Sequence, residues 1–228
     1  DRLEEMFEKQ KQFSSDVTHE LRTPVAVIMA QCQYARKHIN NKEEFDEAIS
    51  LIERQVKKTN DIISQILQLA RLDQDRIRID FEYVDVKDIV EEVCDNEKLH
   101  DEKNIDLRLS LENAEARVDV GLIMAAIRNV INNALKYSYE NSVVDVVLKK
   151  RDGAVELMVR DYGRGMSEEE KKHIFDRFYR ADKARNSEGF GLGLSITARI
   201  MEIHSGTITV ESEEKKGSTF YLTIPERI

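Results

Sequence analysis

His19 is the side chain with the clearest capacity for chemistry in this sequence, because a carboxylate and a hydroxyl stand close to it. On a helix, His19 is rotated by about 200° from Val17 and so points away from the apolar side. Glu20 could accept a ring proton while a nitrogen of His19 attacks phosphorus, and Thr23 lies on the same face. Pro24 leaves the carbonyl of Glu20 without its helical donor, which predicts a bend just past the histidine. An isolated histidine on a helix is more often a solvated surface residue, so these neighbours alone leave both interpretations open.

A second group of polar side chains follows one face of a helix predicted at residues 119–138. Steps of four, seven and eight residues bring Asn133, Lys136 and Tyr137 within about 80° of Asn129 around the helix axis. Two amides in place of the usual Glu and Lys suit a hydrated Mg²⁺ ion and phosphate groups. An amphipathic helix packed on a sheet explains the apolar half of this segment but not the two amides.

Two glycine-rich segments come later in the chain. Asp161–Gly165, DYGRG, follows an alternating stretch, and its glycines allow the backbone to approach a ligand closely. Asp161 could accept a hydrogen bond from an exocyclic amine such as that of adenine, although an ordinary turn residue is the simpler interpretation. Gly189–Leu194, GFGLGL, precedes an apolar helix expected to run to about His204, where exposed amides could bind phosphate. This segment lacks the preceding strand and the spacing of a dinucleotide site, and the chain has no Walker loop.

The stretch between the glycine segments could cover a ligand. Ile174–Arg180, IFDRFYR, is followed by the polar residues 181–188, a composition that suits a mobile lid or a plain surface loop. The remaining histidines have no Cys or His at metal-ligand spacing, so we expect no zinc and favour a solvated or capping role for each of them: His38, His100, His173 and His204.

Two long helices are expected to carry His19. Residues 43–73 are apolar in alternating steps of three and four, the pattern of a helix packed in a bundle. A polar turn around Asn40 and Asn41 joins this helix to the preceding one, which predicts an antiparallel hairpin. Because a lone pair of helices leaves much apolar surface in water, we predict a homodimer in which a second copy completes a four-helix bundle.

A change of hydrophobic period near residues 73–80 indicates a domain boundary, with a hairpin at 1–75 and a layered α/β domain at 80–228. Within the second domain, predicted helices are interspersed with strands whose apolar residues occur at every second position: helices at 86–103 and 119–138, strands at 155–160 and 220–224.

The 228 residues carry a net charge of -9 and include 41% hydrophobic residues, enough for a core of ordinary size. Since the acidic residues are spread along the chain, we expect no nucleic-acid partner. Cys32 and Cys94 match neither a disulfide framework nor a metal knuckle, so we expect a reducing cytosol. No apolar stretch is long enough to span a membrane, yet the chain begins at Asp1 inside a helical pattern. We therefore expect a cytoplasmic fragment of a longer protein, with any membrane segment lying upstream.

Taken in order, these segments resemble those of a known family. Phe13–Pro24, FSSDVTHELRTP, closely resembles the phosphoacceptor box of the sensor histidine kinases of two-component systems. The later segments resemble the N, first-glycine, phenylalanine and second-glycine boxes of the ATP domain of that family, and Gly217–Phe220, GSTF, resembles its closing glycine turn. The resemblance covers residues 10–225. It implies an α + α/β fold: an antiparallel hairpin that forms a dimeric four-helix bundle, then an α/β sandwich of the type shared with gyrases and chaperones.

The resemblance also implies an activity and the residues that perform it. The chain would use ATP to phosphorylate His19 and then pass the phosphoryl group to an aspartate of a response-regulator receiver domain. Glu20 would be the acid/base partner of His19, and Thr23 would orient water in a second activity as a phosphatase, unless it is simply a tolerated helix residue. Asn133 would be the Mg²⁺ ligand. The remaining residues implied to contact ATP are Asn129, Lys136, Tyr137, Asp161, Gly163, Gly165, Arg180, Gly189, Gly191 and Gly193, and Phe175 and Phe178 would anchor the lid.

Two alternatives remain. A gyrase- or chaperone-type ATPase would use the same nucleotide fold, but the HELRTP run argues against it. A non-catalytic dimeric scaffold would be expected to have lost His19, Asn133 or the glycines, which are all present. Phe190 departs from the family pattern, in which small or hydroxylated residues are commoner, and the lid is short; these departures bear on lid dynamics more than on chemistry. The sequence identifies neither the signal nor the regulator, nor whether His19 is phosphorylated within one subunit or across the dimer.

Overall fold

The structure is a computed structural model that describes residues 2–73, 78–99, 103–181 and 189–226. These residues fall into two compact units. The first unit holds the chain up to Arg71 together with Gly189 and Phe190, and the second holds the rest.

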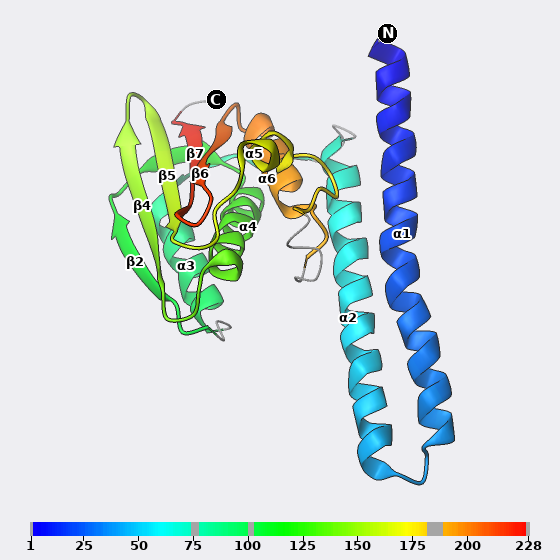
Figure 1. Ribbon diagram of the computed structural model, residues 1–228. Helices are drawn as coiled ribbons and strands as arrows, with labels where there is room; N and C mark the ends of the chain where they lie inside the picture. The colour runs from blue at the N-terminus through cyan, green and yellow to red at the C-terminus, as the bar shows by residue number, and fades with distance from the viewer. Residues whose placement is uncertain (1, 74–77, 100–102, 182–188, 227–228) are drawn as a thin grey trace. The chain divides into compact units, whose positions relative to one another are not determined.

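The first unit is a helical hairpin, as predicted. Helix α1 (Arg2–Lys37) continues through Pro24, and α2 (Lys42–Asp73) returns antiparallel to it (Figure 1). Glu44 holds the connecting turn, because its carboxylate accepts hydrogen bonds from the hydroxyl of Tyr34 and the amide of Asn41, both at 2.9 Å. The sequence therefore predicted both the helices and the polar turn between them.

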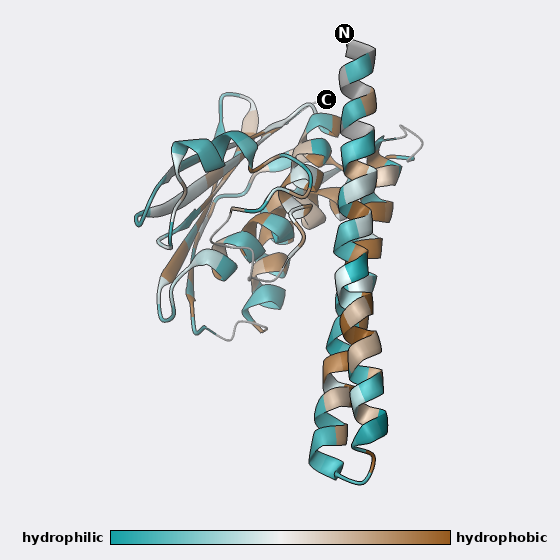
Figure 2. Ribbon diagram, turned by 45° about the vertical axis from the view of Figure 1, so that its right-hand side comes forward, coloured by the Kyte–Doolittle hydropathy of each residue, from teal (hydrophilic) through white to brown (hydrophobic). Residues whose placement is uncertain are grey.

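Part of the predicted apolar seam of α2 is exposed in the single chain. Ile49, Val56 and Ile63 recur every seventh residue and are 37%, 52% and 42% exposed. Figure 2 shows hydrophobic patches interspersed with hydrophilic ones along both helices. The apolar stripe of Ile49, Val56 and Ile63 on α2 is thus not covered by α1.

The second unit is a two-layer α/β sandwich. Its five-stranded sheet has the order β2-β4-β5-β7-β6, in which β2 and β4 are parallel and the other neighbours are antiparallel. Helices α3, α4 and α6 cover one face of this sheet (Figure 1), and β1 pairs with β3 as a separate two-stranded sheet. The strands are β1 (Glu82–Asp85), β2 (Asp106–Leu111), β3 (Glu115–Val118), β4 (Val143–Arg151), β5 (Ala154–Asp161), β6 (Thr207–Glu213) and β7 (Gly217–Pro225), and the helices are α3 (Val86–Lys98), α4 (Val120–Tyr137), α5 (Glu168–His173) and α6 (Gly193–Ile203).

The apolar faces of the sheet and of the helices form one core. Inward residues of β4, β5 and β7 pack against the apolar faces of α4 and α6. This confirms the predicted strands at 155–160 and 220–224 and the predicted helices in α4 and α6, whereas β4 was not predicted. The fully buried side chains include Val146, Leu157, Leu222, Ile123, Ile127, Ile131, Ile196 and Ile200.

The helix predicted at 86–103 is shorter in the structure. Helix α3 ends at Lys98, residues 100–102 lie outside the described part of the chain, and Lys103 lies in the turn before β2. The Nζ of Lys103 donates to the carbonyls of Leu135, Lys136 and Ser138, at the C-terminus of α4. This tertiary contact places a positive charge at the negative end of α4.

Candidate functional site

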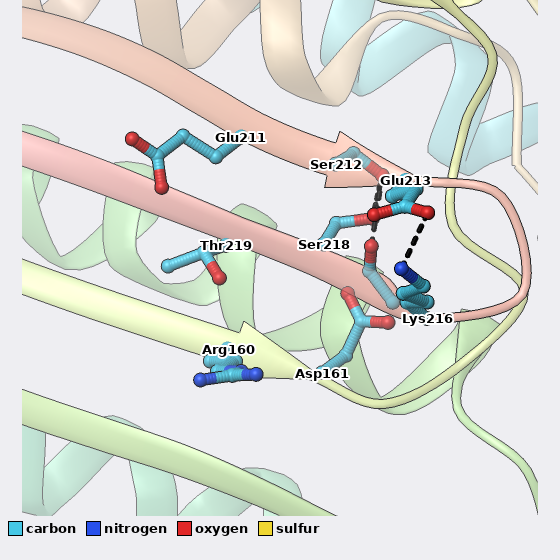
Figure 3. A pocket seen from close by; sticks show the side chains of 9 residues that line it. Arg160, Asp161, Glu211, Ser212, Glu213, Lys216, Ser218 and Thr219 are labelled. Atoms are coloured by element: carbon cyan, nitrogen blue, oxygen red, sulfur yellow. Dashed lines mark hydrogen bonds and ion pairs between the residues drawn. The ribbon is translucent and has the colours of Figure 1, made fainter.

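Asp161 ends β5 in a polar pocket beside the β6–β7 turn. Asp161 is only 3% exposed, and its carboxylate accepts a hydrogen bond from the N–H of Gly163 at 2.9 Å. Burial raises the pKa of Asp161, while the Gly163 and Ser218 donors and the charge of Arg164 act to lower it. Figure 3 shows the residues that line the pocket, namely Arg160, Asp161, Glu211, Ser212, Glu213, Lys216, Gly217, Ser218 and Thr219.

The DYGRG segment is threaded closely between two elements. A Cβ atom on Gly163 would collide with the carbonyl oxygen of Tyr137, the last residue of α4. Gly165 adopts a positive φ of 61° and lies against Glu213 of β6. The chain therefore brings Asp161 and Tyr137, which are 24 positions apart in sequence, to one end of the domain because glycine leaves the backbone room to pass.

The polar face of α4 carries the four residues predicted for it, but their side chains have different contacts. Asn129 donates from its side-chain amide to the carbonyl of Gly193 at 3.0 Å and lies 3.3 Å from the hydroxyl of Thr197. The side chain of Asn133 has no hydrogen-bond partner within the described residues, and Lys136 stands 4.7 Å over the ring of Tyr137. Asn129 thus fixes the start of α6, whereas Asn133 has an amide available to a ligand.

The N-terminus of α6 differs from those of the other helices in the second unit. Asp85, Asp119 and Ser167 cap α3, α4 and α5 with side-chain hydrogen bonds, whereas α6 begins without a side-chain cap. A helix N-terminus without a side-chain cap suits an anion, and phosphate binding by this glycine segment remains a prediction. Gly193 opens this helix.

The segment before the predicted lid contacts the second glycine segment through the backbone. The N–H of Phe178 donates to the carbonyl of Gly191 at 2.9 Å, and both residues have positive φ, 61° and 71°. A Cβ on Gly191 would press on the backbone of Phe178 and Tyr179. The backbone of Phe178 thus lies against Gly191, and the role of Phe178 as a lid anchor remains a prediction.

The other predicted residues of the lid and glycine segments are less closely defined. Phe175 is half-buried, as is Arg180, which has partners of its own. The polar stretch 182–188 lies outside the described residues, and Gly189 groups with the first unit. The roles of Arg180 and Gly189 remain predictions.

On the hairpin, His19 is exposed on α1, as its position relative to Val17 predicted. Glu20 is half-buried beside it. The hydroxyl of Thr23 donates to the carbonyl of His19 at 3.4 Å. The three residues thus lie within one and a half turns of a single helix.

Sequence reasoning missed two residues of the second unit. Arg164 stacks on Tyr137, with its Cζ 4.7 Å from the ring centre, and its position between two glycines after a strand was the available signal. Lys103 gave no signal, because its role depends on a contact with α4 that is distant in sequence. His204, assigned a solvated or capping role, is buried and accepts the N–H of Asp119 at 3.0 Å, so it caps without being solvated.

Comparison with known families matches both units. A family described as the His Kinase A (phospho-acceptor) domain matches residues 9–75, and one described as the histidine kinase-, DNA gyrase B-, and HSP90-like ATPase matches residues 118–228. Among curated proteins, the chain is 34% identical over 219 residues to the probable sensor protein PcoS of Escherichia coli, covering 95% of this chain and 47% of PcoS. The chain therefore spans about half the length of the curated relatives that it matches.

Solved structures give the same fold. Histidine kinase ThkA, in complex with response regulator protein TrrA, has a TM-score of 0.75 at 24% identity and covers 99% of this chain and 66% of that one. Full-length ShkA in complex with AMPPNP has a TM-score of 0.68 at 25% identity and covers 94% of this chain and 45% of that one. Within the described ranges, every helix is too short or too polar to cross a membrane.

Proposed function

The chain belongs to the sensor histidine kinases of two-component systems, and on this basis we propose that it transfers the γ-phosphoryl group of ATP to His19. The observation that carries the proposal is the joint presence of an exposed histidine in the phosphoacceptor hairpin and a nucleotide fold with a buried carboxylate and an uncapped helix N-terminus.

In the proposed reaction, a ring nitrogen of His19 forms a bond to the γ-phosphorus while the bond from that phosphorus to the bridging oxygen breaks, and ADP leaves. Glu20 accepts the ring proton. Because phosphoryl transfer needs little covalent help, positioning and charge neutralisation supply most of the rate. An exposed His19 is suited to this role, since the nucleotide must reach it.

The second unit supplies the nucleotide site. Asp161 accepts the amine of adenine, Tyr137 flanks the base, Lys136 contacts phosphate, and the free amides at the start of α6, near Gly191 and Gly193, receive the phosphate end. Asn133, whose amide has no partner in the described part of the chain, would hold Mg²⁺ through its oxygen. The metal would supply positive charge against the phosphates. We assign Asn129 a supporting role, because its amide already binds the start of α6.

We propose that the chain works as a homodimer in the cytosol and passes its phosphoryl group to an aspartate of a response regulator. The apolar stripe of Ile49, Val56 and Ile63 supports a second copy on the hairpin. The comparison kinase ThkA is in complex with the regulator TrrA, which supports a partner of that class. Thr23 would orient water if the protein also removes phosphate from that regulator.

Incubation with γ-labelled ATP and Mg²⁺ tests the proposal. Wild type should acquire an acid-labile, alkali-stable label that His19→Gln lacks. His38→Gln, which alters another histidine of the hairpin, should still be labelled and serves as the control. Release of phosphate without labelled protein would refute the kinase assignment and favour an ATPase.

A further inference from the structure

Arg164 lies at a junction of three elements around the adenine end of the nucleotide site. Its backbone N–H donates to the carbonyl of Tyr137 at 3.4 Å, and its guanidinium stacks on the Tyr137 ring at 4.7 Å. Its side chain is also 3.8 Å from the carboxylate of Glu170 on α5, within ion-pair distance. Both partner contacts are partly shielded, since Arg164 is 28% exposed and Glu170 17%.

Glu170 is itself fixed. Its second carboxylate oxygen accepts the N–H of Ser167 at 2.7 Å, and its own N–H donates to the Ser167 hydroxyl, which forms the capping box of α5. A carboxylate held in this way restrains the guanidinium that pairs with it. Arg164 therefore has a defined position from which to act on Tyr137.

We propose that Arg164 is a positioning residue of the adenine subsite, which holds the ring of Tyr137 and places a fixed positive charge beside Asp161. The inference rests on the function proposed above and deepens it, because it assigns a residue to base recognition that the family resemblance left unassigned.

The charge has a specific use at this point. Ionised Asp161 accepts the amine of adenine more strongly than neutral Asp161 does, but burial favours the neutral form. The groups of Gly163 and Ser218 that lower the pKa of Asp161 are uncharged, and among the described residues it is the charge of Arg164 that lowers this pKa. The pocket also contains Glu211, Arg160 and the pair Glu213–Lys216, whose carboxylate and ammonium are 2.6 Å apart and largely cancel.

Nucleotide affinity at several pH values tests the inference, with ATP as the probe. Arg164→Gln removes the charge and keeps a polar side chain. It should weaken ATP binding about tenfold at pH 8, the loss of one cation–π contact with its restraint on the ring. The ratio of its Kd to that of wild type should then grow as the pH falls from 8 to 6, since removal of a nearby cation raises a carboxyl pKa. Using the ratio cancels the titration of ATP itself.

Two variants keep the test decisive. Arg164→Lys retains the charge without the planar stack, so it should bind ATP less tightly than wild type but with a Kd ratio that is flat between pH 8 and pH 6. Arg151→Gln breaks an ion pair of the same 3.8 Å length with Glu156, far from Asp161 in the sheet register, and should match wild type throughout.

Arg164→Gln binding within twofold of wild type at every pH would overturn the inference and leave the kinase assignment intact. A pH-dependent loss in Arg164→Lys equal to that in Arg164→Gln would likewise overturn it, since charge would then be irrelevant. Absence of ATP binding by wild type would overturn the proposed function together with the inference.

Discussion

Asp161→Asn should separate nucleotide recognition from folding. In the wild type the carboxylate accepts a hydrogen bond from the N–H of Gly163 and, as proposed, another from the amine of adenine. Asparagine has one acceptor oxygen in place of two, so its NH₂ group must face one of these donors. The adenine amine is the donor that can be given up without disturbing the protein.

The expected size of the effect follows from that count. A hydrogen bond to a charged group contributes about 1.5–3 kcal/mol, which corresponds to about a 10- to 150-fold loss of ATP affinity. Folding should change far less, because the lost acceptor is offset by relief from burying a charge in a site that is 3% exposed.

Isothermal titration with ATP and GTP, together with thermal unfolding, measures both quantities. Asp161→Asn should also narrow the preference for ATP over GTP, because the new NH₂ group can donate to the O6 of guanine. Asp145→Asn is the matched control, since Asp145 accepts one hydrogen bond from the hydroxyl of Tyr162 and lies outside the pocket. ATP affinity within threefold of wild type, or equal losses for ATP and GTP, would refute the assignment of Asp161 to the adenine amine.

Three further outcomes are expected. Asn133→Ala should abolish most of the Mg²⁺-dependent gain in ATP affinity while leaving Mg²⁺-free binding nearly unchanged, and an unaltered Mg²⁺ titration would argue against its role as ligand. Gly163→Ala should reduce ATP affinity more than tenfold and lower Tm, because its Cβ would meet the carbonyl of Tyr137, whereas Gly121→Ala, whose Cβ would have no atom nearer than 3.6 Å, should be neutral or stabilising by about 0.5–1 kcal/mol. Burial lowers the pKa of His204, so the folded protein keeps this histidine neutral while the unfolded chain takes up a proton below about pH 6.5. The stability contributed by His204 is therefore present above that pH and is lost as the pH falls. The change of Tm between pH 7 and pH 5 should be smaller in His204→Gln than in wild type.

The sequence predicted those features that depend on local pattern. The seam of residues 43–73 and the alternation in β5 and β7 identified the hairpin and the sheet, because each period follows directly from helix or strand geometry. Helix periodicity also predicted that Asn129 and Asn133 lie on one face of α4. Conversely, the predicted end of α3 was too late in the chain. The contacts of Lys103 with carbonyls of α4 more than 30 positions away could not be predicted from local pattern.

The partners of the site residues could not be obtained in this way. Sequence spacing placed Asn129 and Asn133 on one face but could not show that Asn129 is occupied by Gly193 while Asn133 remains available. It also placed Arg164 between two glycines without indicating that Tyr137 would lie beneath it. These distinctions arise from tertiary packing between segments distant in sequence, and they decide which residue we propose as a ligand-binding residue and which as a positioning residue.

Helix α4 shows how such positioning is organised over the whole site. Its first turn is tied to α6 by the N–H of Asp119, which donates to His204, and its middle is tied to the start of α6 by Asn129. Its last turn is capped by Lys103. The α4 residues predicted to contact ATP, from Asn129 to Tyr137, lie at or between these contacts, so the helix can present them in one arrangement before the nucleotide binds. This lowers the entropy lost on binding. A substitution that removes one of these contacts should therefore weaken nucleotide binding, even though the contact does not involve the nucleotide. These contacts thus link the packing of α4 to the arrangement of the nucleotide site.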